Sequence, residues 1–80
     1  MSEDTLNRVI QVIAEAQRIS PEGIHADSTF EELKIDSLDG INIVFAIENE
    51  FNINVPDDAA KSIRTVRDMA EGVERLVSGA

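Results

Sequence analysis

The sequence predicts an all-α fold: a four-helix bundle with three main helices, one short third helix and a long loop between helices one and two. Apolar residues recur at helical spacing, first in the run Leu6, Val9, Ile10 and Ile13. Capping residues precede two later apolar runs, at Asp36 and Thr65. The chain has 80 residues, 42% of them apolar, which suits a single small domain over residues 1–80.

The first helix is expected from about Glu3 to Arg18. It has to end near Ile19, because the following Ser20-Pro21-Glu22-Gly23 is a turn signal: proline disfavours helix at the residue before it, and glycine tolerates turn conformations. Residues 24–35 sustain no period and are predicted to form a long structured loop. Within this loop, Ser28-Thr29-Phe30-Glu31 resembles a capping box. Its Phe30 is expected to pack with Leu33 and pin one short turn against the core.

The second helix is expected from about Ser37 to Phe51. Asp36 offers its cap, and Asp39 places a second carboxylate in the first turn, where the helix dipole favours negative charge.

The third and fourth helices follow a break at Val55-Pro56-Asp57-Asp58. Proline and aspartate suit the start of a helix, so a short one is expected from Asp57 to about Ser62. Thr65, with Asp68 at the capping-box position, begins the last helix. The apolar stripe of that helix is Val66, Met69, Ala70, Val73, Leu76 and Val77. Residues 78–80 are expected to fray.

The second helix has two apolar stripes. On a helical wheel, the stripe of Leu38, Ile41 and Phe45 is centred about 140° from the other. The other stripe is Ile43, Val44, Ile47 and Phe51. A central helix buried on both sides is one interpretation. Asp39 and Glu48 flank the first stripe, however, and burying them without partners would be costly, so we interpret that stripe as an exposed docking surface.

The charge of the chain is strongly negative and unevenly placed. Sixteen acidic residues against seven basic ones give a net charge of −9. Residues 27–58 hold nine acids against Lys34 alone, which is −8 of that total. This balance opposes binding to nucleic acid or insertion into anionic membranes and favours partners with basic docking surfaces.

The absence of cysteine excludes a disulfide framework and a thiolate nucleophile, and is compatible with a reducing cytoplasm. The start of the chain, residues 1–6, lacks the basic and apolar regions of a signal peptide, and no run of 18 apolar residues occurs. The sequence therefore predicts a soluble cytoplasmic protein.

Ser37 is the residue of greatest chemical interest. It directly follows the cap of the second helix, where free backbone N–H groups and the helix dipole would stabilise a phosphate ester on its oxygen.

The string around this serine resembles the attachment motif of the acyl carrier protein family, Asp36-Ser37-Leu38-Asp39. The similarity continues through Glu48-Asn49-Glu50-Phe51, the linking segment 52–58, and Thr65-Val66-Arg67-Asp68. Upstream, residues 30–35 look like the stretch that leads into the motif. The resemblance therefore covers nearly the whole domain.

The resemblance implies a carrier without catalysis of its own. In such a carrier, Ser37, next to Asp36, would be joined to 4′-phosphopantetheine from coenzyme A by a phosphopantetheinyl transferase. The arm would supply the thiol that the sequence lacks, for acyl groups of fatty acid, polyketide or related lipid synthesis. The resemblance also implies partner-binding residues, namely Leu38, Asp39, Ile41, Phe45 and Glu48. It implies an acyl-chain cleft lined by Ile43, Val44, Ile47 and Phe51. A monomer is expected.

The sequence departs from carriers of fatty acid synthesis, which commonly have glutamates at Asn42 and Asn49, a small residue at Ile35 and often methionine at Phe45. These departures suggest a specialised carrier rather than the general one.

Four alternatives stay open. An aminoacyl or peptidyl carrier of nonribosomal synthesis shares the modified serine, although glycine and histidine more often precede it there. A serine hydrolase would need His25, the only histidine, as its base. A calcium module would need a ligand where Leu38 stands. A plain interaction bundle would leave Ser37 unmodified.

Overall fold

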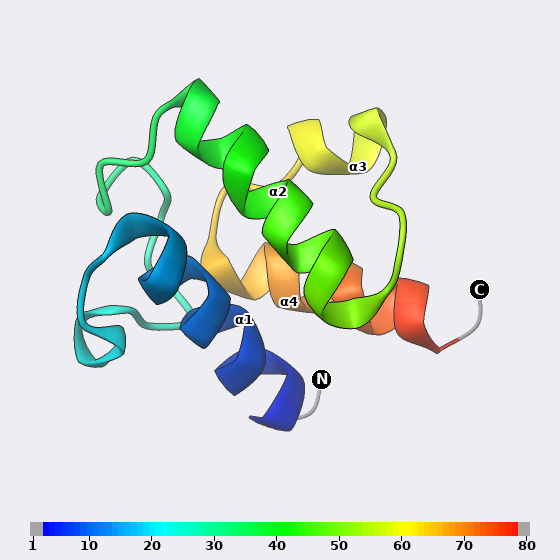
Figure 1. The fold of residues 1–80 in the computed structure, drawn as a ribbon, viewed down its shortest axis with the longest axis horizontal. Helices are drawn as coiled ribbons and strands as arrows, with labels where there is room; N and C mark the ends of the chain where they lie inside the picture. Colours follow the sequence, from blue (N-terminus) through cyan, green and yellow to red (C-terminus); the bar gives the residue numbers. More distant parts are fainter. Residues whose placement is uncertain (1–2, 79–80) are drawn as a thin grey trace.

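The chain folds into four α-helices and one 3₁₀ turn in a computed structural model that describes residues 3–78 (Figure 1). The elements are α1 (Glu3–Gln17), η1 (Pro21–Gly23), α2 (Ser37–Phe51), α3 (Asp57–Lys61) and α4 (Val66–Val77). The predicted all-α architecture, with a short third helix and a long loop before α2, is confirmed. The bounds of α2 agree with the prediction at both ends, and α3 ends one residue earlier than predicted.

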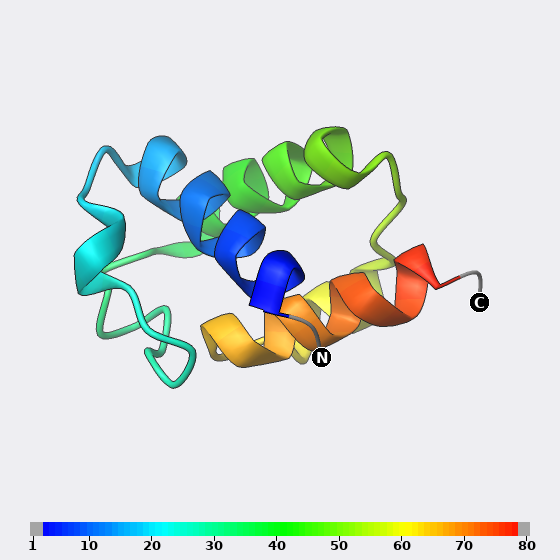
Figure 2. The same ribbon diagram turned by 90° about the horizontal axis from the view of Figure 1, so that it is seen from below.

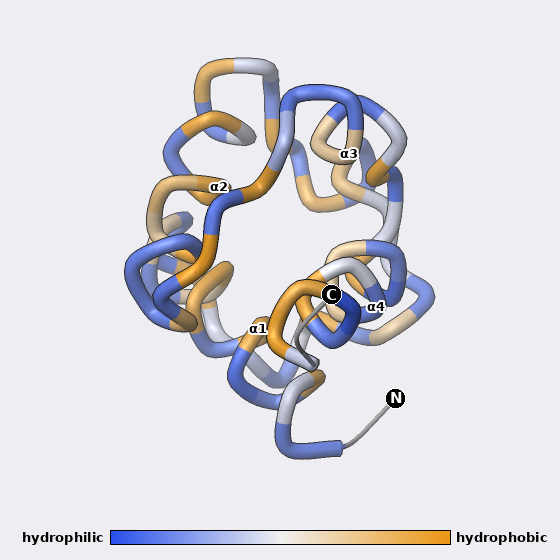
Figure 3. The backbone as a smooth tube through the Cα atoms, turned by 90° about the vertical axis from the view of Figure 1, so that its right-hand side faces the viewer, coloured by the Kyte–Doolittle hydropathy of each residue, from blue (hydrophilic) through white to orange (hydrophobic). Residues whose placement is uncertain are grey.

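The core lies where α1 packs against both α2 and α4 (Figure 2). Viewed towards one end of the molecule, the four helices surround a common centre, and each carries apolar residues (Figure 3). The buried residues are Val9, Val12, Ile13, Ala14, Ile24, Ile43, Ile47, Val66, Met69, Ala70 and Val73. Within residues 3–78 no polar or charged side chain is buried. The buried core is therefore made of apolar side chains only.

Three helical turns end on a non-glycine residue in the left-handed conformation. Arg18 (φ 57°), Lys34 (φ 61°) and Asn52 (φ 56°) each stand in this position. After each of them, the next N–H donates back to a carbonyl five residues earlier: Ile19 to Ala14, Ile35 to Phe30, and Ile53 to Glu48. Glycine or asparagine usually marks such an end, so Arg18 and Lys34 gave no signal in the sequence. The first helix accordingly ends at Gln17, one residue before the predicted end.

The long loop contains a capping box, but one residue later than predicted. Thr29 and Glu32 form the reciprocal pair: the Glu32 N–H donates to Thr29 Oγ1 at 3.0 Å, and the Thr29 N–H donates to Glu32 Oε1 at 2.9 Å. Ser28 was the predicted cap, but its hydroxyl instead accepts the N–H of His25 at 3.0 Å. The sequence fits a capping box either from Ser28 to Glu31 or from Thr29 to Glu32, because both pairs have suitable residue types three positions apart. Phe30 and Leu33 pack against the core, as expected.

The loop is also hydrogen-bonded to the start of α4, a long-range contact that no sequence signal indicated. The Phe30 N–H donates to the carbonyl of Arg64, and the Val66 and Arg67 N–H groups donate to the carbonyls of Ser28 and Ala26. The Arg67 guanidinium pairs with Asp27 at 3.0 Å. These bonds satisfy N–H groups at the start of α4 and fix the loop that leads into α2.

The predicted capping box of α4 is confirmed. The Asp68 N–H donates to Thr65 Oγ1 at 3.0 Å, and the Thr65 N–H donates to Asp68 Oδ2 at 3.2 Å. At the other end of the helix the predicted stripe is one residue too long, because Val77 is 53% exposed in the last position of α4. Ser78 does not fray: its N–H donates to the Glu74 carbonyl at 3.0 Å. Residues 79–80, the rest of the predicted frayed end, lie outside the described residues.

The two capping boxes should make stability depend on pH. The Thr29 N–H and hydroxyl lower the pKa of Glu32, and the N–H groups of Arg64 and Thr65 lower the pKa of Asp68. Each pKa is lower in the folded protein than in the unfolded chain. The two carboxylates therefore stabilise the fold fully at any pH above the pKa of an unfolded carboxyl group. This stabilisation is expected to be lost as the pH falls below about 4, through the folded-state pKa values.

The measurement is the melting temperature between pH 7 and pH 3, for wild type and for Asp68→Asn. Acidification also relieves repulsion among the acidic side chains, so the informative quantity is the difference between the two proteins. Asp68→Asn should melt lower than wild type at neutral pH, and the gap should narrow in acid. Asp58→Asn, at an exposed position on α3, is the matched control. A gap that stays constant down to pH 3 would contradict the assignment.

Candidate functional site

Ser37 lies exposed as the first residue of α2, and its surroundings leave two backbone donors available. The Asp39 N–H donates to Oδ1 of the cap, Asp36, at 2.9 Å, and the Gly40 N–H donates to the Asp36 carbonyl at 2.8 Å. The N–H groups of Ser37 and Leu38 have no acceptor among residues 3–78. Donors of this kind, at the positive end of the helix dipole, favour a phosphate on the serine oxygen. Two backbone donors therefore lie beside the exposed hydroxyl of Ser37.

An exposed apolar stripe begins next to this serine. Leu38 is 72% exposed, Ile41 51% and Phe45 58%, whereas Ile43 and Ile47 on the other stripe are each 1% exposed. The interpretation of α2 as a helix buried on both sides is therefore wrong. We call Leu38, Ile41 and Phe45 the outer stripe. An apolar patch of this kind on a small domain is typical of a surface that binds another molecule.

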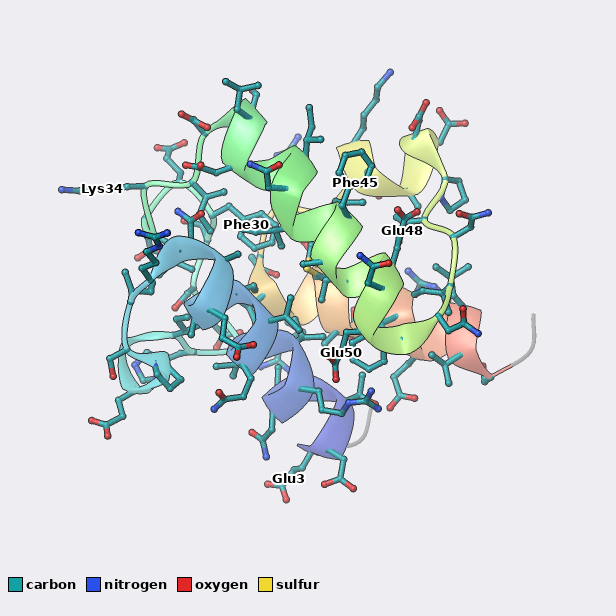
Figure 4. The ribbon with its side chains drawn as sticks, viewed as in Figure 1. Glu3, Phe30, Lys34, Phe45, Glu48 and Glu50 are labelled. Carbon is teal, nitrogen blue, oxygen red and sulfur yellow. The ribbon has the colours of Figure 1, made fainter. Side chains whose placement is uncertain are left out.

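Carboxylates border the outer stripe but differ in what they contact. Asp36 is exposed and Asp39 half-buried near Ser37. Glu48 is half-buried, and its Oε2 accepts the N–H of Val55 at 2.8 Å. Phe45 and Glu48 project from neighbouring turns of α2, and Lys34 projects away from the helix (Figure 4). Negative charge therefore surrounds the stripe, and Glu48 also holds the segment that follows α2.

Glu50 is engaged within the fold. Its carboxylate pairs with Arg8 of α1 at 3.1 Å, and the same guanidinium donates to the Glu50 carbonyl at 3.1 Å. The Arg8 guanidinium also lies 4.2 Å from the centre of the Phe51 ring. This cation–π contact joins α1 to the end of α2, in the region between the two helices where Glu50 is labelled (Figure 4).

A small apolar cavity of about 10 Å³ lies between α2, α4 and the segments that flank α3. Its lining residues are Val44, Ile47, Val55, Ile63, Met69, Gly72, Val73 and Leu76. Two of the predicted cleft residues, Val44 and Ile47, belong to this lining. The other two do not: Ile43 is in the core, and Phe51 lies under Arg8. The helical wheel of α2 gives no information on the residues of other helices that face it. In the structure, three residues of the predicted α4 stripe line the cavity across from α2, namely Met69, Val73 and Leu76.

His25, which a serine hydrolase would need as its base, makes no hydrogen bond to Ser37 within the described residues. His25 is exposed in the long loop. In the described part of the chain, no three histidine or acidic side chains gather into a group that could hold a metal ion. None of the helices within residues 3–78 is long and apolar enough to cross a membrane.

Comparisons with known proteins identify the family of the chain. The sequence profile described as "Phosphopantetheine attachment site" matches residues 7–73, a range that includes Ser37. The chain is 39% identical over 75 residues to the acyl carrier protein of Trieres chinensis, covering 92% of this chain and 94% of that protein. It belongs to the acyl carrier protein family. The acyl carrier protein of a Sulfurovum species is 41% identical over 69 residues, covering 85% of this chain and 92% of the other.

The fold agrees with family membership. The crystal structure of an acyl carrier protein from Thermotoga maritima matches with a TM-score of 0.79 and 28% sequence identity, over 89% of this chain and 84% of that one. The covalent prosthetic group of this carrier is 4′-phosphopantetheine. A phosphate ester fits the start of α2, because Ser37 is exposed there and the N–H groups of Ser37 and Leu38 have no acceptor among residues 3–78. When bound, the arm supplies a thiol that holds an acyl group as a thioester.

Proposed function

We propose that Ser37 is the attachment residue of the phosphopantetheine arm. The supporting observation is its position: an exposed hydroxyl at the start of α2, next to the unpaired N–H groups and to the outer stripe. In the transfer, Ser37 Oγ would attack the phosphorus of coenzyme A that bears the pantetheine. A phosphodiester would form, the serine proton would leave, and 3′,5′-adenosine diphosphate would depart. Asp36 would act by capping the helix and so keeping both N–H groups directed at the phosphate.

We further propose that the outer stripe, with Asp39 and Glu48 beside it, is the surface that partner enzymes bind. These partners are the phosphopantetheinyl transferase and the enzymes that transfer or modify acyl groups. The exposure of Leu38, Ile41 and Phe45 supports this role, as does the surrounding negative charge, which would attract basic docking surfaces. The chain itself would have no catalytic activity and would act as a monomer in the cytoplasm.

The cargo is proposed to be an acyl group of fatty acid, polyketide or related lipid synthesis. The names of the relatives support an acyl rather than an aminoacyl cargo. Carriers of fatty acid synthesis commonly have glutamates at the positions of Asn42 and Asn49 and often methionine at Phe45. Compared with them, this chain has less acidic charge on α2 and a bulkier outer stripe. A specialised carrier with dedicated partner enzymes would account for these three residues.

The proposal is tested by the intact mass of the protein after incubation with coenzyme A and a phosphopantetheinyl transferase. Wild type should gain the mass of one phosphopantetheine. Ser37→Ala should gain none, because it lacks the nucleophilic oxygen.

Ser62→Ala, which removes an exposed hydroxyl just after α3 and outside α2, is the matched control and should be modified fully. Equal modification of Ser37→Ala and wild type, or no modification of wild type, would contradict the assignment. Circular dichroism checks that Ser37→Ala keeps its helical content.

A further inference from the structure

The wall of the apolar cavity has one position without a side chain. Gly72 stands in the middle of α4 and belongs to the lining of the cavity. Met69 and Leu76, three residues before it and four after it, are on the same face of α4 and also line the cavity. A Cβ atom added at Gly72 would meet nothing within 4 Å. The helix thus leaves space at a point where its neighbours fill the wall.

Helix stability gives no reason for glycine at this position. Glycine is destabilising within a helix relative to alanine, and Gly72 lies far from either end of α4. The space beside it excludes close packing of another element as the explanation. A glycine of this kind is explained if something absent from the free protein occupies the room next to it.

The cavity lies within reach of the proposed attachment residue. Ser37 and Val44 are seven residues apart on α2, so they point to nearly the same side of the helix and are separated by about 10 Å along its axis. All the lining side chains are apolar. An alkyl chain carried on an arm at Ser37 would therefore reach an apolar cavity lining two helical turns away.

The cavity must widen to hold more than a very small group, and one of its walls is suited to movement. Val55 and Ile63 bracket α3 and line the cavity, while α3 itself has no buried residue and no side-chain cap. The opposite wall is fixed by the core residues Ile47, Met69 and Val73. Entry of a chain would displace the α3 side and leave the α4 side, with Gly72, in place.

We propose that Gly72 determines the size of the acyl chain that the cavity accepts. The inference rests on the proposed function of Ser37. The missing side chain leaves room for the distal carbons of the cargo, and a larger residue at this position would occupy that room.

The test is the melting temperature of the protein carrying saturated acyl chains of increasing length on its arm, compared with the arm alone. In wild type, the melting temperature should rise with chain length until the cavity is filled, and then level off. In Gly72→Leu it should level off about four carbons earlier, because the leucine side chain takes up the volume of as many carbons. Gly72→Ala should shift the plateau less, and by itself should raise the melting temperature of the protein with the empty arm.

Glu71→Leu is the control, because Glu71 is the exposed neighbour of Gly72 on α4 and does not line the cavity. Its length dependence should equal that of wild type. An unchanged plateau in Gly72→Leu, or a melting temperature that no chain length raises in wild type, would overturn the inference while leaving Ser37 as the attachment residue. If mass spectrometry found no arm on the wild type, the proposed function would fail, and this inference with it.

Discussion

Ile43→Ala is expected to lower the free energy of unfolding by about 3 kcal/mol, within the range of roughly 2–5 kcal/mol measured for such substitutions in buried cores. Ile43 is 1% exposed in the core between α1, α2 and α4. Its truncation removes apolar contacts and leaves a cavity. For a domain of this size, the loss should lower the melting temperature by roughly 15 °C.

Ile41→Ala is the matched control, because it makes the same chemical change two residues away on the same helix. Ile41 is 51% exposed, so its truncation should change the free energy of unfolding by no more than about 0.5 kcal/mol. Urea denaturation of both variants measures the difference. Equal losses at the two positions would show that the outer stripe is packed within the fold and would remove the basis of the docking surface.

The contrast between these two isoleucines was predictable from the sequence, because it follows from local periodicity. The helical wheel separated the two stripes of α2, and the carboxylates beside one of them indicated which stripe faces water. The caps Asp36 and Thr65 were found in the same way, since a cap and its N–H partner lie within three residues of each other. Ser37 was proposed as the attachment residue because of its place after a cap and the motif around it.

The parts that were not predictable depend on contacts between distant segments or on unfavourable backbone conformations. The hydrogen bonds of residues 26–30 to the start of α4 join segments nearly 40 residues apart, and neither segment alone carries a signal for them. Arg18 and Lys34 adopt a conformation that their residue types disfavour. The cavity forms only where α4 packs near α2. The sequence of α4 alone therefore could not show that Gly72 lines it.

The acidic residues of the segment 27–58 differ in whether the fold already engages them. The count of acids in residues 27–58 located the negative charge of the chain. It could not show which carboxylates are free of contacts within the fold and so able to bind a partner. Glu50 is paired with Arg8, and Glu48 holds the N–H of Val55. Asp36 and Asp39, beside Ser37, remain nearest to the proposed attachment site. Glu48 therefore links the proposed docking surface to a residue of the cavity wall, a connection visible only in the folded chain.

Phe45→Ala is expected to reduce kcat/KM of a phosphopantetheinyl transferase for this protein by about 30-fold, the equivalent of a loss of about 2 kcal/mol at an aromatic contact in an interface. Phe45 has the largest side chain of the outer stripe and is 58% exposed. Because most of the ring is in water in the free protein, its truncation should cost little stability. The transferase rate and the urea midpoint, measured on the same sample, separate binding from folding.

Val77→Ala is the matched control, because Val77 is similarly exposed, at 53%, but lies at the end of α4 outside the outer stripe. Its kcat/KM should equal that of wild type. Added salt should lower kcat/KM for wild type and for both variants, since the acids beside the stripe attract the enzyme by long-range forces that salt screens. The apolar contact of Phe45 is short-range, so the 30-fold ratio should persist at high salt. If the ratio disappeared, or if Val77→Ala lost as much activity as Phe45→Ala, the outer stripe would not be the docking surface.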